Sequence, residues 1–171
     1  KAIRRQRQMC IRDREGTEFE RLGNLTDAFA VLSYTLPGMP LIYTGQETGL
    51  NRALEFFVKD KAPEWEPRNK YFDFYKKLNH LKHTQKALLA GEEGGEMVRY
   101  MTESPDLYIF SREKDNSRVI VFANLGSAQQ EVKYTGKAPE ADATTVDFFA
   151  GEAAEFPTSL NPGEYRVYVD R

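Results

Sequence analysis

The sequence predicts an α/β segment followed by an all-β antiparallel sandwich. Apolar residues recur at helical spacing in two runs before residue 90. After Gly95 the spacing changes from 3.6 to 2, and turn residues separate short alternating runs. A series of short strands of this kind is typical of an antiparallel sandwich. We therefore expect an α/β unit in residues 15–94 and the sandwich in residues 95–171.

The composition is that of a globular protein and excludes several functional classes. The chain has 171 residues, of which 40% are hydrophobic and 29% charged, with a net charge of -2. This balance gives no electrostatic case for binding nucleic acid. No run of about 18 apolar residues occurs, so we expect no membrane association. The single cysteine excludes an internal disulfide framework.

The first 14 residues differ in charge from the rest of the chain. They hold six basic side chains and one acid, Asp13, and so carry a net charge of +5, which leaves -7 for residues 15–171. A basic arm for an anionic surface is one interpretation. No aromatic residue interleaves the charges, and no apolar stretch of a secretion signal follows. We interpret residues 1–14 as a basic leader that is not native to the protein.

The first helix is expected over residues 24–36. Asn24 is placed to cap it, Asp27 lies in its first turn, and Pro37-Gly38 ends it. The short apolar run 40–44 then has the pattern of a strand buried on both faces of a parallel sheet.

Gln46 and Glu47 follow that expected strand directly. The carboxyl end of a strand is the functional edge of α/β proteins, so both side chains are candidates for a substrate-site rim. The stretch 48–66 has no sustained period, and we predict a long structured loop with a functional role.

The clearest helix is predicted over residues 68–89, with Gly91 as its C-cap and Gly94-Gly95 as a linker. His80 and His83 are three residues apart on it, but no third ligand has matching spacing, so we favour a solvated face over a metal site. The expected strands, with a weaker one near 153–156, are 97–102, 107–112, 118–124, 129–135, 144–149 and 164–169.

The residues alone do not make an active site for glycosidic hydrolysis. That reaction needs two carboxyl groups on either side of the scissile bond. Glu47 is the best-placed carboxylate, and none pairs with it convincingly. No nucleophile elbow, phosphate-binding glycine loop, H-E-x-x-H helix or Cys-x-x-Cys pair occurs.

Residues 16–171, nearly the whole chain, resemble the α-amylase family of glycoside hydrolases, and three stretches illustrate the resemblance. The first is the run from Gly16 to Gly23, and the last is Leu160–Tyr168, similar to the closing strand of the family's C-terminal domain. Between them lies a run of the type G-x-P-x-I-Y-x-G-Q-E, carried by Gly38, Pro40, Ile42, Tyr43, Gly45, Gln46 and Glu47. The resemblance implies an incomplete TIM (β/α)8 barrel end, with the last strand and helices, before an antiparallel β-sandwich. A whole barrel needs about 200 residues or more.

The resemblance also implies which groups this chain lacks. The family is a retaining one that uses an Asp nucleophile, a Glu acid/base and a further Asp in an Asn-His-Asp motif. The first two belong to earlier barrel strands, and residues 7–14 hold no Asn-His-Asp where the third belongs. Asp13 is no substitute, because neither Asn nor His precedes it. No catalytic residue carries over, and Gln46 and Glu47 are expected to order the rim through hydrogen bonds.

The sequence thus predicts a fragment of a retaining α-glucan-cleaving glycoside hydrolase that is inactive alone. The expected partner of the complete enzyme is an α-glucan or maltooligosaccharide. We expect no cofactor in this chain and calcium as an option in the full-length enzyme. Localisation stays open, with a bacterial extracellular or periplasmic place as one option.

Two alternatives remain open at this point. The β-domain could be a non-catalytic carbohydrate-binding or stabilising module, with sugar rings stacked on aromatic side chains. The candidates for such stacking are Trp65, Tyr100, Tyr108 and Tyr134. The other alternative is a transglycosylating or isomerising relative with the same barrel end.

Overall fold

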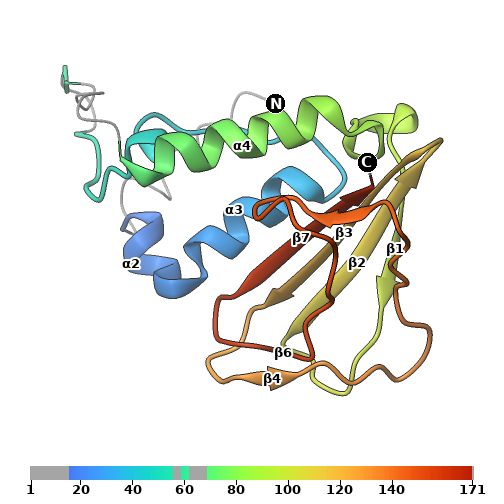
Figure 1. The fold of residues 1–171 in the computed structure, drawn as a ribbon. Helices are drawn as coiled ribbons and strands as arrows, with labels where there is room; N and C mark the ends of the chain where they lie inside the picture. Colours follow the sequence, from blue (N-terminus) through green and yellow to red (C-terminus); the bar gives the residue numbers. More distant parts are fainter. Residues whose placement is uncertain (1–15, 56–58, 62–68, 171) are drawn as a thin grey trace.

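A computed structural model describes residues 16–55, 59–61 and 69–170 and consists mainly of antiparallel sheet with few helices (Figure 1). The basic leader, residues 7–14 and Trp65 lie outside the described residues. The helices are α2 (Glu18–Leu22), α3 (Thr26–Thr35) and α4 (Lys70–Thr84), with short 3-10 turns η1 (Gly23–Leu25), η2 (Gln46–Thr48), η3 (Lys86–Leu88) and η4 (Gly91–Glu93). The strands are β1 (Glu96–Tyr100), β2 (Leu107–Lys114), β3 (Ser117–Asn124), β4 (Gln130–Glu131), β5 (Thr145–Asp147), β6 (Ser159–Leu160) and β7 (Tyr165–Asp170).

Five strands form one antiparallel sheet in the order β1-β2-β3-β7-β5. Helices α3 and α4 lie over one of its faces, and the segments that carry β4 and β6 lie on the other side (Figure 1). Alternation along each strand sorts the side chains between these faces. Phe110 and Val121 pack with the helices, and Ile109 and Phe122 pack with Leu160 on the opposite face.

The sheet therefore contributes to two cores. The core away from the helices is built from residues 100–168 alone. The other core is shared, because Val31 of α3 and Leu78 and Leu81 of α4 are fully buried in one cluster with Val121 and Val167. Burial of each such side chain stabilises the fold by about 1.5–3 kcal/mol, so the helices and the sheet depend on each other.

Arg112 of β2 connects these layers. Its side chain is only 2% exposed and faces the helical side of the sheet. The guanidinium donates to the carbonyl oxygens of Gly95 and Leu89, both at 3.0 Å, and to that of Thr35 at 3.4 Å. One side chain thus links the end of α3 and the segment after α4 to the sheet.

The first helical region begins earlier than the sequence predicts. The Thr17 hydroxyl accepts from the Glu20 N–H, and the Glu20 carboxylate accepts from the Thr17 N–H, which makes a capping box at the start of α2. The role predicted for Asn24 is wrong: it lies within η1, and α3 starts after Leu25 without a side-chain cap. Thr26 instead bonds back to the Gly23 carbonyl at 2.8 Å.

The expected strand over residues 40–44 is also not formed. This segment has no regular secondary structure, and Leu41 is 84% exposed. A strand of a parallel sheet needs neighbours for its N–H and C=O groups. No described strand lies beside this segment, so its apolar pattern stays unpaired in this chain.

The second long helix is shorter than predicted and ends differently. Asn69 caps α4 by accepting from the Tyr71 N–H at 2.9 Å, and the helix stops at Thr84, so Gly91 is not its C-cap. Gly94 and Gly95 do not form a loose linker. A side chain at Gly94 would clash with the Leu89 carbonyl and with Arg112, and the Gly95 N–H donates to the Ala87 carbonyl at 2.8 Å.

Five of the predicted strands are formed, and the two predicted in the connecting segments form only short pairings. The runs near 97–102, 107–112, 118–124, 144–149 and 164–169 correspond to β1, β2, β3, β5 and β7. The run 129–135 forms only the two-residue β4 and a bridge from Tyr134 to Thr102, and 153–156 forms only a bridge from Ala153 to Val146. The pairing of β4 with β6 was not expected.

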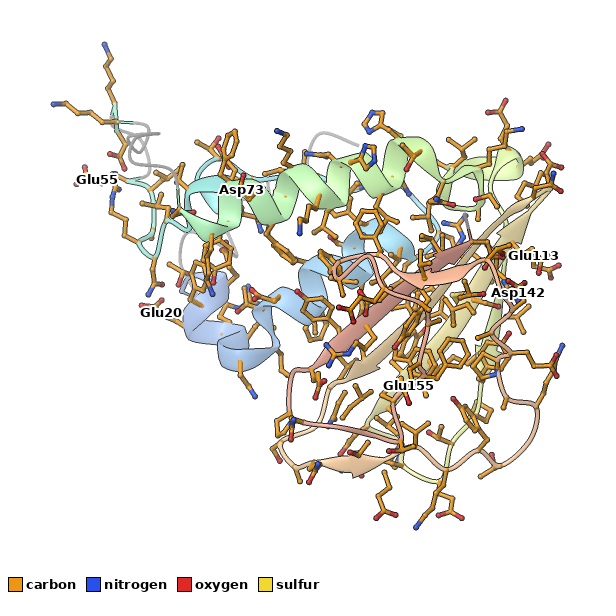
Figure 2. All side chains as sticks on the ribbon, in the orientation of Figure 1. Glu20, Glu55, Asp73, Glu113, Asp142 and Glu155 are labelled. Carbon is orange, nitrogen blue, oxygen red and sulfur yellow. The ribbon has the colours of Figure 1, made fainter. Side chains whose placement is uncertain are left out.

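Arg118 holds the edge strand β5 through four partners, one of which is the Glu140 carbonyl at 3.2 Å. Its Nε donates to Asp170 at 2.9 Å, and one terminal nitrogen donates to Asp142 at 2.9 Å and to the Thr145 hydroxyl at 3.0 Å. Asp142 also accepts from the Thr144 hydroxyl and N–H, which together with Arg118 lower its pKa to about 2. Asp142 lies at the end of the sheet near Glu113 (Figure 2).

We expect the free energy of unfolding to decrease at low pH, and we expect Asp142 to cause part of this decrease. Because the pKa is lower in the folded state, this carboxylate contributes stability above its unfolded value of about 4. That contribution is lost as the pH falls from about 4 to about 2. Unfolding midpoints in urea between pH 7 and pH 2 should therefore show a weaker acid dependence for Asp142→Asn than for the parent chain. Equal slopes for the two proteins would contradict this assignment.

Candidate functional site

The predicted rim residues lie in a closed turn between the segment 40–43 and α4. Gly45 and Gly49 flank η2 with φ values of 96° and 65°, which side-chain-bearing residues rarely adopt. The Gln46 N–H donates to the Tyr43 carbonyl at 3.0 Å, and the Leu50 N–H donates to the Gly45 carbonyl at 2.9 Å. The glycines therefore allow the chain to reverse direction directly after the apolar run.

Gln46 and Glu47 both bond to the backbone of their own turn. Gln46 Oε1 accepts from the Tyr43 N–H at 2.7 Å, and Glu47 Oε2 accepts from the Gly45 N–H at 3.1 Å. Each side chain supplies an acceptor that a neighbouring strand would supply in a sheet. Their geometry is that of groups that order a turn.

The turn is attached to the first residues of α4. Asn69, which caps this helix, donates its side-chain N–H to the Thr48 carbonyl. A side chain at Gly49 would meet the Tyr71 ring at 2.5 Å, so Gly49 also permits the close approach of the turn to the helix. The position of Glu47 is thus set by α4 as well as by the turn itself.

A groove of about 490 Å³ opens between this turn and α4. Its lining consists of Ile42, Thr44, Glu47, Phe72, Tyr75, Lys76 and Asn79. Residues 72, 75, 76 and 79 follow i, i+3, i+4 and i+7 spacing and so share one face of the helix. The same spacing in the sequence is equally typical of a helix face buried in the core. The sequence therefore does not predict that these residues line a groove.

The groove carries a single carboxylate, whereas glycosidic hydrolysis requires two carboxyl groups. A retaining mechanism uses two carboxyl groups about 5–5.5 Å apart. Glu47 is the one carboxylate among the described residues that line the groove. One of its oxygens already accepts from the Gly45 N–H. This arrangement can order a site or accept one hydrogen bond from a ligand, but it does not provide an acid and a nucleophile.

The predicted long loop is described in part. Arg52 forms a two-pronged ion pair with Asp60, with nitrogen–oxygen distances of 2.7 and 3.1 Å, and the Glu55 N–H donates to the same carboxylate at 2.8 Å. These bonds hold the pKa of Asp60 well below its usual range. The loop is thus structured where it is described, and its predicted functional role stays a prediction.

The three described aromatic side chains among the candidates for sugar stacking do not form one platform. Tyr100 is 8% exposed, and its hydroxyl bonds with Ser111 at 3.0 Å. Tyr134 packs against the same core cluster, and the Arg99 guanidinium covers the Tyr108 ring at 3.8 Å from its centroid. Three of the four candidates therefore have roles in packing, and Trp65 lies outside the described residues.

The described residues contain no group of three His, Cys, Asp or Glu side chains placed to hold a metal ion. His83 Nδ1 bonds with the Asn79 carbonyl at 2.8 Å, and His80 stacks on Phe148. Calcium stays a prediction for the full-length enzyme. Among the described helices, none meets the length and hydropathy that a membrane span requires.

Comparison with known proteins finds likeness in both sequence and fold. The chain is 29% identical to the α-amylase MalA of Haloarcula japonica over a match that covers 79% of this chain and 22% of that protein. It thus spans about a fifth of the length of this curated relative. No protein-family model matches the chain.

Two solved structures illustrate the shared fold. The maltogenic α-amylase AmyB of Thermotoga neapolitana superposes with a TM-score of 0.70 at 16% identity, over 86% of this chain and 36% of that one. The α-amylase of Geobacillus thermoleovorans, solved with acarbose, gives a TM-score of 0.62 at 18% identity, over 86% of this chain and 32% of that one. The likeness therefore covers most of this chain and about a third of each solved structure.

Proposed function

From the premise that this chain is a homologue of α-amylases at low identity, matching a C-terminal part of such proteins, we propose that it belongs to a retaining glycoside hydrolase that cleaves α-1,4-linked glucans. The observation that carries the proposal is the sequence likeness to an α-amylase over 79% of the chain. The names of the solved relatives, one maltogenic and one bound to acarbose, support an α-glucan as the substrate class.

The described residues support a structural role for this chain within a longer enzyme. The turn around η2 holds Gln46 and Glu47 by backbone hydrogen bonds of 2.7 and 3.1 Å, and the groove beside it carries one carboxylate. Leu41 is 84% exposed in a segment with an apolar pattern and no described strand partner. In our proposal, further strands of the longer enzyme pair with this segment and supply the catalytic acid and nucleophile.

The chain alone is expected to show no turnover of starch or of an activated maltoside. Loss of both catalytic carboxyl groups removes acid, nucleophilic and charge-stabilising catalysis, so the rate should fall about 10⁶-fold or more below that of a complete enzyme. The measurement is release of reducing ends and of the chromogenic leaving group by the purified chain, against a buffer blank. A Glu47→Gln variant purified in parallel is the control for contaminating amylase, which would act equally in both preparations. Turnover above the blank that Glu47→Gln abolishes would contradict the proposal.

A further inference from the structure

A second cavity, of about 560 Å³, lies at the edge of the sheet, away from Gln46 and Glu47. One wall is the turn that follows β5, and the other is the first half of β7. The segment from β5 to β6 crosses in front of the sheet, and Glu155 lies on it, on the side away from α4 (Figure 2). The function proposed above does not use this cavity, so its residues are free to hold a different ligand.

Hydrogen bonds hold the two walls of the cavity in place. Asp147 Oδ1 accepts from the Phe149 and Ala150 N–H groups at 2.8 and 2.9 Å, which closes the turn after β5. The Tyr168 hydroxyl of β7 donates to the Glu155 carbonyl at 2.9 Å and so ties the opposite wall to the segment that follows the turn. A ligand that enters would meet preformed walls, which lowers the entropic cost of binding.

The charge of the lining is strongly negative. Four carboxylates line the cavity, on Asp147, Glu152, Glu155 and Glu164, and Arg166 is the one cation among the described lining residues. Arg166 is already paired with Glu164 at 2.7 Å. The other three carboxylates have no cationic partner among the described residues, and two of them, on Glu152 and Glu155, belong to exposed residues. The lining therefore repels anions and attracts cations.

The carboxylates act on the tyrosines that share the lining with them. Burial raises the pKa of Tyr168 to about 12, and the charge of Asp147 adds to this rise. Burial likewise raises the pKa of Tyr165 to about 12, with further contributions from Asp27 and Asp147. Arg166 lowers both pKa values but does not reverse the direction. The negative charge is thus felt inside the cavity, and both tyrosine rings stay neutral at physiological pH.

Aromatic rings supply the apolar part of the same lining. Phe149, Tyr165 and Tyr168 all line the cavity. Phe149 meets Tyr165 edge to face at 5.6 Å between centroids, and it stacks on Phe74 of α4 at 6.1 Å, which fixes the turn against the helix. Aromatic rings attract cations through their faces and offer apolar surface to methylene groups. The lining therefore combines negative charge with apolar surface.

This combination selects an organic cation as the ligand class. No group of three His, Cys, Asp or Glu side chains among the described residues is placed to hold a metal ion. An alkylammonium group, by contrast, donates up to three hydrogen bonds to carboxylates and is attracted by aromatic rings. Three carboxylates without a cationic partner are more than one ammonium group needs. A ligand with two or more ammonium groups joined by methylene chains matches both the charges and the rings.

We propose that this cavity binds a linear aliphatic diamine or polyamine. Its ammonium groups donate to the carboxylates of Glu152, Glu155 and Asp147. Its methylene segments contact the rings of Phe149 and Tyr165. Binding involves no covalent step, and the inference does not rest on the function proposed above.

The test is titration of the full ¹⁵N-labelled chain with spermidine at constant ionic strength and pH, followed by two-dimensional amide NMR spectra. Backbone signals of residues 147–155 and 164–168 should shift in a saturable way. Glu152→Gln/Glu155→Gln keeps the shape of both side chains but removes their charge, and it should weaken binding about tenfold or more. Glu96→Gln/Glu103→Gln, which removes two exposed carboxylates elsewhere, is the matched control and should bind like the parent chain.

Several outcomes would overturn the proposal. They are absence of saturable shifts in these residues and equal binding by both double variants. Magnesium chloride producing the same shifts with the same affinity would show an acidic surface that attracts any cation. A neutral diol that binds as tightly as the diamine of equal chain length would overturn the role of charge. None of these results bears on starch turnover, so failure of this site and failure of the proposed function are distinguishable.

Discussion

Replacing Arg112 by methionine is expected to lower the free energy of unfolding by about 3 kcal/mol. Methionine fills much of the same volume but donates no hydrogen bond. The carbonyl oxygens of Gly95 and Leu89, each bonded at 3.0 Å, would lose this donor, and at the buried Gly95 water does not replace it. Urea unfolding followed by circular dichroism measures the change.

Two further variants separate this effect from loss of charge. Arg21→Met removes an exposed arginine from α2 and should change stability by less than about 0.5 kcal/mol. Arg112→Lys keeps the charge but not the planar fork of donors, so it should fall between the parent chain and Arg112→Met. If Arg112→Met were as stable as Arg21→Met, the guanidinium would not be what holds the helices to the sheet.

Asn124→Asp is expected to destabilise the chain by about 2 kcal/mol or more at pH 7. Asn124 is fully buried, and its amide N–H groups donate to the carbonyls of Ala128 and Leu160, both at 2.9 Å. The substitution is nearly isosteric, yet it removes both donors and places a carboxylate against two carbonyl oxygens. Thermal or urea unfolding at pH 7 measures the loss.

The pH dependence gives this prediction a second readout. Burial and the facing carbonyls would raise the folded-state pKa of the new carboxyl above its unfolded value of about 4. The variant's deficit should therefore be largest at neutral pH and shrink as the pH falls through the folded-state pKa, since the protonated group can donate to one carbonyl. Asn116→Asp, at an exposed turn, is the control and should show no such recovery. A deficit independent of pH would point to lost packing instead.

Local patterns in the sequence were sufficient for much of the fold. Alternation over residues 107–124 predicts the β2–β3 hairpin, whose register pairs Phe110 with Val121. Helical spacing likewise predicts α3 and α4 and places Leu78 and Leu81 on a buried face. These elements depend on neighbours within a few residues, so their signal lies in a short stretch of chain.

The sequence predicted where the candidate rim lies along the chain, but not the structure of the segment before it. The G-Q-E run after an apolar segment marked Gln46 and Glu47, and the structure places both in one turn beside a groove. The role of the apolar segment itself could not be read locally. Its pattern is that of a buried strand, but a strand forms only where partners are present, and no described strand lies beside residues 40–43.

By itself, then, the sequence determined the hairpins, the faces of the two longer helices and the resemblance to α-amylases. Only the tertiary structure decided the tasks of Arg112, Gly94 and Asn124, and the cavity between the turn after β5 and the start of β7. Arg112 donates to Thr35, 77 positions away, and Asn124 to Leu160, 36 positions away. Such contacts leave no periodic trace, because a charged or polar residue in a strand looks solvated until the packing of distant segments excludes water from it.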